Sequence, residues 1–211
     1  MRRVTIDALQ PAAAALEEAA AIIAAGGVVA MPTDTLYGLA ADPFSEAAVA
    51  KVFAVKGRSA ERAMPLVAAS LEQVMSQVGR LSDAAARLAA QYWPGPLTLL
   101  VARPASIRAD VAGGRDEIGV RVPAHAVTRE LCRVCGRLLT ATSANLSGAP
   151  ATNDPDEVAR ALPATVDLLL DAGRTPGGAP STIVDVTGRE VRLVRPGAIP
   201  WDDVLACMQR R

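Results

Sequence analysis

Short, almost continuous runs of apolar residues alternate along the chain with longer stretches in which apolar residues recur every three or four positions. The short runs have the length and composition of buried strands, and the longer stretches are typical of helices that pack one face on a sheet. The alternation predicts an α/β fold in which helices cover at least one face of the β-sheet. The predicted strands are 28–31, 65–68, 97–102, 118–122, 138–142, 166–170, 182–186 and 191–194.

Capping residues mark where the predicted helices begin and end. An alanine-rich helix opens at Pro11 and closes at Gly26, in keeping with the preference for proline first and glycine last. Ser70 is followed by Gln73 at the spacing of a capping box, and Asp154 before a proline is a strong helix start. Further helices are predicted from Ser45 to about Val55, from Ser82 to the turn at Trp93–Pro96, and over 125–135.

The sheet is predicted to be mixed, because residues 187–189 between the last two strands have the composition of a hairpin turn. The polar segment 33–39 is predicted to be a loop. We find no internal repeat and no low-complexity tract, and strands continue after the Gly/Pro-rich run 173–180. We therefore expect residues 1–211 to form a single domain.

Composition and charge argue against several classes of protein. The 22 basic and 22 acidic residues give a formal net charge of zero, which argues against a chain that coats nucleic acid. Aromatic residues make up only 3%, too few for a base-stacking platform. Three cysteines do not make a disulfide framework, and Glu17 and Glu18 break the alanine-rich segment, so it is neither a signal peptide nor a membrane span. We expect a cytoplasmic protein with no membrane contact.

Several common catalytic sites are absent from the sequence. It has neither the P-loop pattern nor the glycine fingerprint of dinucleotide-binding folds. The single histidine, His125, and one Cys-x-x-Cys pair cannot build a zinc site, so no metal bound by the protein alone is expected. Cys132 and Cys135 fall within a helical pattern and are interpreted as packed thiols, and His125 as a capping or packing residue.

Polar residues remain at strand ends and in loops, where α/β enzymes place their sites. Four cations with hydroxyl and amide donors, and no obvious general base, favour an anion-binding site of the kind that nucleotidyl transfer requires. Each element also has an ordinary alternative, since Lys-x-Arg after a helix is usually a solvated last turn and Ser-Ala-Asn is a common turn composition. The elements are Thr33-Asp34-Thr35, Lys56-x-Arg58, Arg121, Ser143-x-Asn145, Ser181-Thr182 and Arg195-Pro196-Gly197.

Taken in order, eight short segments resemble the YrdC-like family of threonylcarbamoyl-AMP synthases. No single segment is decisive, but all eight follow the family's order and together they span about residues 12–200. Longer family members carry an extra C-terminal domain, and this chain ends at Arg211, so the resemblance is to the short, single-domain form. The segments are Met31–Leu39, Lys56–Arg58, Pro65–Leu66, Trp93–Thr98, Val120–Pro123, Thr142–Gly148, Pro180–Asp185 and Arg195–Gly197.

The resemblance implies a fold and an activity. The fold is a twisted mixed sheet with a concave, positively charged cleft. The activity is that of a nucleotidyltransferase that forms threonylcarbamoyl-AMP and pyrophosphate from L-threonine, bicarbonate or CO₂, and ATP. This is the first step towards N6-threonylcarbamoyladenosine at position 37 of tRNA. A separate threonylcarbamoyl transferase complex is implied as the downstream partner, and the resemblance allows direct contact with tRNA or other RNA.

The resemblance also assigns roles to residues. Arg121 is expected to bind the carboxylate of threonine, a pairing that suits its planar guanidinium. Mg²⁺ is expected to accompany ATP without a dedicated protein cage. The family's catalytic Lys-Arg-Ser-Asn tetrad is matched by Lys56, Arg58, Ser143 and Asn145. ATP binding is assigned to Lys56, Arg58, Asn145, Asn153 and Arg195, and threonine binding to Thr35, Arg121, Ser143 and Ser181.

The chain departs from the family pattern at three places. Six residues separate Arg58 from Pro65, where related sequences often have four, and Glu117 and Asn153 stand where a small hydroxyl residue and a threonine are common. Two alternatives stay open. One is a paralogue of the same fold that binds nucleotide or double-stranded RNA without forming the adenylate. The other is a carbamoyl-AMP-forming domain of the hydrogenase-maturation type, which normally belongs to a longer chain with zinc-finger cysteines.

Overall fold

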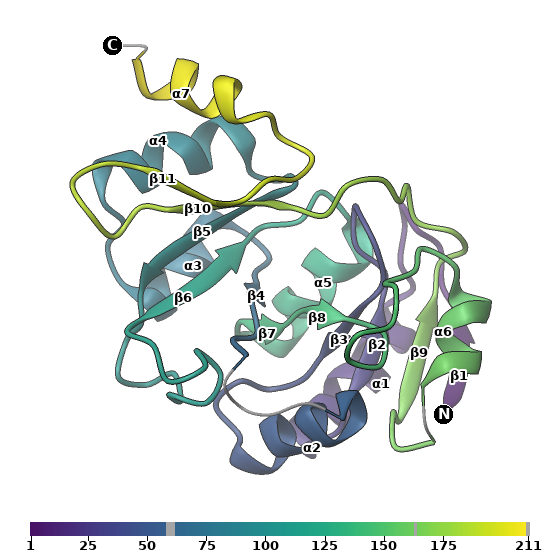
Figure 1. The fold of residues 1–211 in the computed structure, drawn as a ribbon. Coiled ribbons are helices and arrows are strands. Elements are labelled where there is room, and N and C mark those ends of the chain that lie inside the picture. Colours follow the sequence, from purple (N-terminus) through teal and green to yellow (C-terminus); the bar gives the residue numbers. More distant parts are fainter. Residues whose placement is uncertain (58–61, 163, 210–211) are drawn as a thin grey trace.

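Residues 1–57, 62–162 and 164–209 are described by the computed structural model, and they form two mixed sheets with helices packed against them (Figure 1). β1, β9 and β2 of the first sheet run parallel, whereas β3 is antiparallel to both of its neighbours. In order across the sheet the five strands are β1 (Arg2–Thr5), β9 (Leu168–Asp171), β2 (Val29–Met31), β3 (Gly38–Ala40) and β8 (Thr142–Ser143).

The second sheet has six strands and is also mixed. β10 and β11 form the antiparallel pair predicted around residues 187–189, while β10 pairs with β5 in parallel. The mixed α/β class expected from the sequence is therefore confirmed. In order across the sheet the strands are β11 (Arg192–Arg195), β10 (Thr182–Asp185), β5 (Leu97–Ala102), β6 (Glu117–Arg121), β4 (Leu66–Val67) and β7 (Leu139–Thr140).

The two sheets meet where the chain runs from β7 into β8. β7 is the edge of the second sheet and β8 the edge of the first, with only Ala141 between them. Ala141 donates its N–H to Pro65 O at 2.8 Å, and Thr140 donates its N–H to Ala41 O at 3.0 Å. The single strand predicted over 138–142 is thus divided, and the one twisted sheet expected from the sequence is two sheets joined at this crossing.

Four of the helices begin at the predicted caps. Side-chain oxygens of Ser45, Ser82 and Asp154 each accept a backbone N–H two or three residues further on, at 2.8–3.3 Å. The capping box is half formed: Ser70 Oγ accepts the N–H of Gln73, but Gln73 Oε1 accepts the N–H of the residue before Ser70. No helix in the described ranges has the length and apolar character needed to cross a membrane. The helices are α1 (Ala13–Ala24), α2 (Glu46–Lys56), α3 (Leu71–Val78), α4 (Asp83–Tyr92), α5 (Ala126–Cys135), α6 (Pro155–Ala161) and α7 (Trp201–Gln209).

Alternate residues of the buried strands face two different cores. Val29 and Met31 of β2 pack with α1 and α5, while Ala30 between them belongs to the larger core that includes the second sheet. The central Leu169 of β9 faces the larger core in the same way. Because both faces of these strands are covered, their sequences are continuously apolar, which is the pattern from which they were predicted.

Three elements were not predicted from the sequence. β1 is mostly exposed and lacks an apolar pattern, and it is a strand because it pairs with β9. β3 lies partly in the segment predicted as a loop, yet its residues are buried between β2 and β8. α7 follows the last predicted strand and packs on α4 (Figure 1). Tertiary pairing, rather than a local periodicity, therefore decides all three.

Leu39→Ala tests the contribution of β3 to stability. The side chain of Leu39 is fully buried, so its truncation leaves a cavity and is expected to lower the free energy of unfolding by about 2–5 kcal/mol. Leu9→Ala is the matched control, because Leu9 is 84% exposed and its truncation should change stability by no more than about 0.5 kcal/mol. Urea denaturation followed by circular dichroism measures both. Equal stabilities of the two variants would contradict the burial of β3.

Candidate functional site

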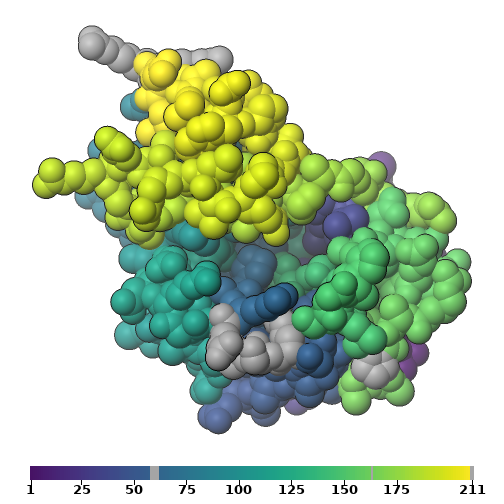
Figure 2. Space-filling model, viewed as in Figure 1, coloured from purple at the N-terminus to yellow at the C-terminus, as the bar shows by residue number. Residues whose placement is uncertain are grey.

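A pocket of about 460 Å³ opens between the two sheets. Figure 2 shows this face of the molecule hollowed beneath the C-terminal strands, which are coloured yellow-green. The walls come from segments that are far apart in sequence, including residues 33–38, β4, β5, β6, β10 and the crossing from β7 to β8. The polar and charged lining residues are Thr33, Thr35, Arg62, Thr98, Arg115, Arg121, Thr142, Ser143, Ser181 and Arg195.

The lining of the pocket is positively charged. Four arginines face it, and no carboxylate residue lines it in the part of the chain that the structure describes. Arg121 and Arg195 were predicted from the sequence, whereas Arg62 and Arg115 were missed. Arg115 directly follows two glycines with φ values of 64° and 78°, which turn the chain towards β6. That glycine pair before a strand is a signal that could have drawn attention to Arg115, but nothing in the sequence singles out Arg62.

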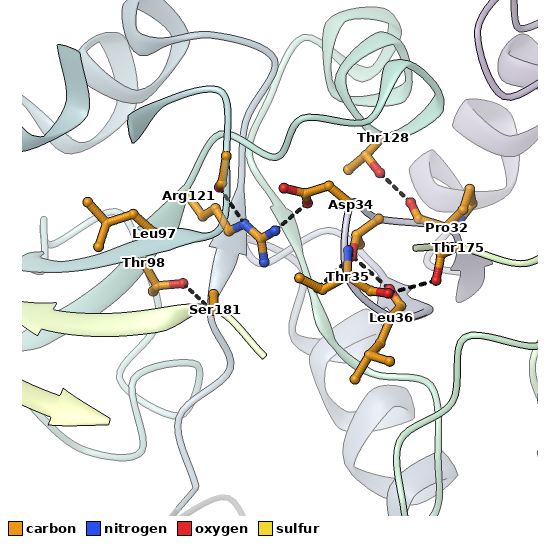
Figure 3. A network of polar contacts seen from close by, with 12 residues as sticks. Pro32, Asp34, Thr35, Leu36, Leu97, Thr98, Arg121, Thr128, Thr175 and Ser181 are labelled. Carbon is orange, nitrogen blue, oxygen red and sulfur yellow. Dashed lines mark hydrogen bonds and ion pairs between the residues drawn. The ribbon is translucent and has the colours of Figure 1, made fainter. Parts of the chain in front are cut away.

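Arg121, at the end of β6, is held along one edge of its guanidinium. Its Nε donates to Gly95 O at 2.9 Å, and its Nη2 forms an ion pair with Asp34 Oδ1 (Figure 3). Nε and Nη2 lie on the same edge, so the outer end formed by Nη1 and Nη2 is not occupied by these two acceptors. Such an end binds a carboxylate with two parallel hydrogen bonds.

Asp34 belongs to the Thr-Asp-Thr segment, but no role was predicted for it. Its side chain is 10% exposed, and its Oδ2 is buried without a hydrogen-bond partner among the described residues. His125 Nδ1 is likewise buried without a hydrogen-bond partner among the described residues. Burial lowers the pKa of His125, while the nearby negative charge of Asp34 acts to raise it. His125 makes no side-chain cap bond to α5, so of its two predicted roles the structure supports packing and not capping.

Hydroxyl groups line the pocket on either side of Arg121. Thr35 is fixed through its carbonyl oxygen, which accepts a hydrogen bond from Thr175 Oγ1 at 2.7 Å (Figure 3). Ser181 Oγ lies 2.8 Å from Thr98 Oγ1. Thr35, Arg121 and Ser181, together with Ser143, are the four predicted threonine-binding residues, and all four line this one pocket.

Arg195 lies at the end of β11 and reaches back towards β10. Its Nη2 donates to Ser181 O at 2.6 Å and to Ser181 Oγ at 3.1 Å. Partial burial of the guanidinium, followed by the nearby positive charge of Arg121, lowers the pKa of Arg195. An anion bound between these two arginines would offset their mutual repulsion.

Lys56 is buried beside the pocket and is not among its lining residues. It ends α2 and is 3% exposed, and its Nζ donates to Ser143 O at 2.6 Å and to Asn145 O and Oδ1, each at 2.9 Å. Ser143 Oγ donates to the same Asn145 Oδ1 at 2.5 Å. Three members of the predicted tetrad therefore form one cluster, in which the three donors of the ammonium hold residues 143–145 in place.

The other two predicted site residues are Arg58 and Asn153. Arg58 falls outside the described residues. Asn153 Nδ2 donates to Thr175 O at 3.1 Å, and neither Asn153 nor Glu117 is among the residues that line the pocket. Asn153 therefore has a structural contact with the segment that supports Thr35, and its contact with ATP stays a prediction.

Cys132 and Cys135 are free thiols on α5 and do not line the pocket. Burial raises the pKa of both thiols, that of Cys135 to about 11. Both are therefore protonated near neutral pH and are poor nucleophiles, in agreement with their interpretation as packed thiols. No group of three or more His, Cys, Asp or Glu side chains in the described ranges is arranged to hold a metal ion.

Comparison with known proteins identifies relatives of this chain. The Sua5/YciO/YrdC family model, described as telomere recombination, matches residues 21–197. The threonylcarbamoyl-AMP synthase of Pyrococcus abyssi is 36% identical over 186 residues, which cover 88% of this chain and 55% of the relative. The threonylcarbamoyl-AMP synthase of Idiomarina loihiensis is 35% identical over 167 residues, which cover 78% of this chain and 90% of the relative. The chain thus spans about half the length of the archaeal relative.

The fold is also that of a solved structure. The crystal structure of P. abyssi Sua5 complexed with L-threonine superposes with a TM-score of 0.94 at 32% sequence identity, covering 99% of this chain and 61% of that one. The stretch matched by the family model includes all the residues that line the described pocket. The chain therefore belongs to the Sua5/YciO/YrdC family.

Proposed function

We propose that this protein forms threonylcarbamoyl-AMP and pyrophosphate from L-threonine, bicarbonate or CO₂, and ATP. The observation that carries the proposal is Arg121, a buried guanidinium with an open outer end in a pocket lined by hydroxyls and further arginines. The relatives named above are threonylcarbamoyl-AMP synthases, and the structure of the P. abyssi protein was determined with L-threonine. Together they support threonine and ATP as the substrates.

Threonine binds in the half of the pocket that contains Arg121. Its carboxylate accepts two hydrogen bonds from the outer end of the guanidinium, while the hydroxyls of Thr35, Ser143 and Ser181 bond to the rest of the amino acid. A volume of about 460 Å³ is larger than an amino acid needs, so room remains for the phosphates of a nucleotide.

The triphosphate of ATP lies towards Arg195 and the loop at residues 143–145, with Arg58 and Asn153 contributing further contacts. Burial and, after it, the positive charge of Arg121 lower the pKa of Arg195, and a phosphate between the two arginines relieves the repulsion between them. Hydroxyls, but no carboxylates, are present among the described lining residues, and this donor set fits an Mg²⁺ ion held mainly by the triphosphate and water. Bound in that way, the ion supplies positive charge that offsets the phosphate charge.

The reaction brings two anions together. The ammonium group of threonine loses a proton to solvent, and the resulting amine forms an N–C bond to CO₂ and releases a second proton to give a carbamate. A carbamate oxygen then attacks the α-phosphorus of ATP. A new P–O bond forms, the bond to the β-phosphate oxygen breaks, and pyrophosphate leaves with the electron pair. The arginines reduce the repulsion between the reacting anions. Arg121 binds the threonine carboxylate and in this way keeps the carbamate on the same molecule in line for attack.

Lys56 acts through the loop that it holds. All three donors of its ammonium have oxygen partners in Ser143 and Asn145, so the phosphate contact predicted from the sequence requires it to leave one of them. In the observed arrangement it fixes Ser143, which lines the pocket. We therefore assign Lys56 a positioning role.

The wider setting follows from the family resemblance. The product feeds a separate threonylcarbamoyl transferase complex that modifies adenosine 37 of tRNA, in the cytoplasm. Residues 1–211 act as one domain, and direct contact with tRNA is compatible with the positive pocket lining.

Incubation of the protein with labelled bicarbonate, L-threonine and ATP tests the proposed activity. We expect pyrophosphate release that depends on both threonine and bicarbonate, with label in a threonylcarbamoyl-adenylate. Binding of nucleotide or double-stranded RNA by folded protein, without threonine-dependent pyrophosphate, would instead identify the non-catalytic paralogue.

Arg121→Ala should chiefly weaken the binding of threonine. A charge-assisted hydrogen-bonded contact contributes about 1.5–3 kcal/mol, so we expect the apparent KM for threonine to rise by about 10- to 100-fold. Arg137→Ala is the control, because Arg137 pairs with Asp42 and does not line the pocket. Initial rates of pyrophosphate release against threonine concentration measure both. An unchanged KM in Arg121→Ala would remove the assignment.

Lys56→Met should reduce both activity and stability. Three buried oxygens lose their donor, which is expected to lower the free energy of unfolding by about 1–3 kcal/mol. Displacement of the loop is expected to reduce pyrophosphate release by about 100-fold. Lys51→Met is the control, since Lys51 is the other lysine of the chain and forms a partly exposed ion pair with Asp167. Normal turnover in Lys56→Met would show that the loop needs no such support.

A further inference from the structure

Arg121 and Arg195 line the same pocket, yet their partners differ in charge. Arg121 is ion-paired with the carboxylate of Asp34, whereas Arg195 donates to the uncharged oxygens of Ser181. No carboxylate pairs with Arg195 within residues 1–57, 62–162 and 164–209. Arg121 thus has a counter-charge beside it, whereas the oxygens of Ser181 that Arg195 contacts are uncharged.

The two proposed substrates also differ in net charge. Threonine enters as a zwitterion whose charges sum to zero, and ATP enters as a polyanion. A guanidinium without a counter-charge strongly attracts either carboxylate or phosphate. A carboxylate beside the guanidinium weakens its attraction for a bare anion and favours a ligand that carries an ammonium group next to the anion. A carboxylate beside one arginine and not beside the other can therefore direct threonine to the first arginine and the phosphates of ATP to the second.

We propose that Asp34 is a specificity-determining residue that reserves the Arg121 half of the pocket for a ligand with an ammonium group. Asp34 does not line the pocket, so it acts from behind Arg121 and through it. The inference rests on the proposed function, because it takes an amino acid as the ligand of Arg121. It adds the property that an amino acid is selected over a carboxylate or phosphate that lacks the positive charge.

The geometry lets Asp34 act in this way without blocking the site. Asp34 Oδ1 binds the same edge of Arg121 as Gly95 O does, so the outer end of the guanidinium stays available to the ligand (Figure 3). Asp34 Oδ2 is buried and accepts no hydrogen bond among the described residues. A buried carboxylate oxygen without a partner is rare and costs stability, so its retention here calls for a functional explanation.

Asp34→Asn removes the charge and keeps the shape and an acceptor for Arg121. Isothermal titration with L-threonine and with (R)-3-hydroxybutyrate, the same skeleton without the amine, measures the preference for the zwitterion. We expect the ratio of the two affinities to fall by about tenfold or more in the variant, because loss of the negative charge favours the anion over the zwitterion however the individual affinities move. Inorganic pyrophosphate should also compete more strongly with threonine in the variant.

Asp42→Asn is the matched control, since Asp42 is also about nine-tenths buried and ion-paired with an arginine, and does not line the pocket. Its ratio should equal that of the unmodified protein. If Asp34→Asn does not fold, Asp34→Ser serves as the neutral variant and Asp34→Glu as the charged one, and only the former should lose the preference.

The inference is overturned if a folded neutral variant keeps the ratio of affinities for L-threonine and (R)-3-hydroxybutyrate unchanged. It is also overturned if folded Asp34→Glu loses the preference for L-threonine. Failure of the proposed function is a separate result. It shows as absence of threonine-dependent pyrophosphate release, whereas the affinity ratio is measured without turnover.

Discussion

The segment from Leu139 to Ser143 pairs with strands of both sheets, and the pocket exists because of this crossing. β7 completes the edge of one sheet and β8 the edge of the other, so the sheets cannot separate without loss of ladder hydrogen bonds on both sides. Backbone N–H and C=O groups that are buried without a hydrogen-bond partner destabilise the fold, because they have lost their hydrogen bonds to water and gained none in exchange. The crossing therefore fixes the distance between the walls that carry Ser143 and Arg121.

Two buried cations, Lys56 and Arg121, border this pocket, and their different side-chain geometries suit them to different roles. Lys56 has a compact ammonium with three donors, and it satisfies three oxygens of the 143–145 segment. Arg121 has a planar, five-donor guanidinium, so it can be held along one edge while the outer end stays open. A chain with 22 basic residues and only two lysines, Lys51 and Lys56, keeps one of them where a point charge suits the geometry.

Charge in the pocket is arranged locally, although the net charge of the chain is zero. Most of the ion pairs among the described residues lie outside the pocket, while four arginines and no described carboxylate line its walls. Asp34 is ion-paired with one of these arginines, Arg121, and does not itself line the pocket. A neutral composition and a positive site are therefore compatible, because binding responds to charges within a few ångströms.

The sequence alone determined the fold class, most strands and helices, and the set of segments that carry the site. Strands such as β2 and β9 are covered on both faces and must be apolar throughout, and helix caps depend on a side chain only two or three residues away, so both signals are local. The order of the motifs at Thr35, Arg121, Ser143 and Ser181 also pointed to one site, and all four residues line it.

Only the tertiary structure decided which atoms of these residues remain available. It divided one predicted strand between two sheets, turned Lys56 inward to three oxygens, paired Asp34 with Arg121, and added Arg62 and Arg115 to the lining. Each of these features joins residues that are far apart in the chain, and a hydrogen bond or ion pair across such a separation leaves no periodicity in the sequence. Local apolar patterns therefore determine the helices and strands. Tertiary contacts between distant segments determine the charge of the pocket and which hydrogen-bond donors in it remain available to a ligand.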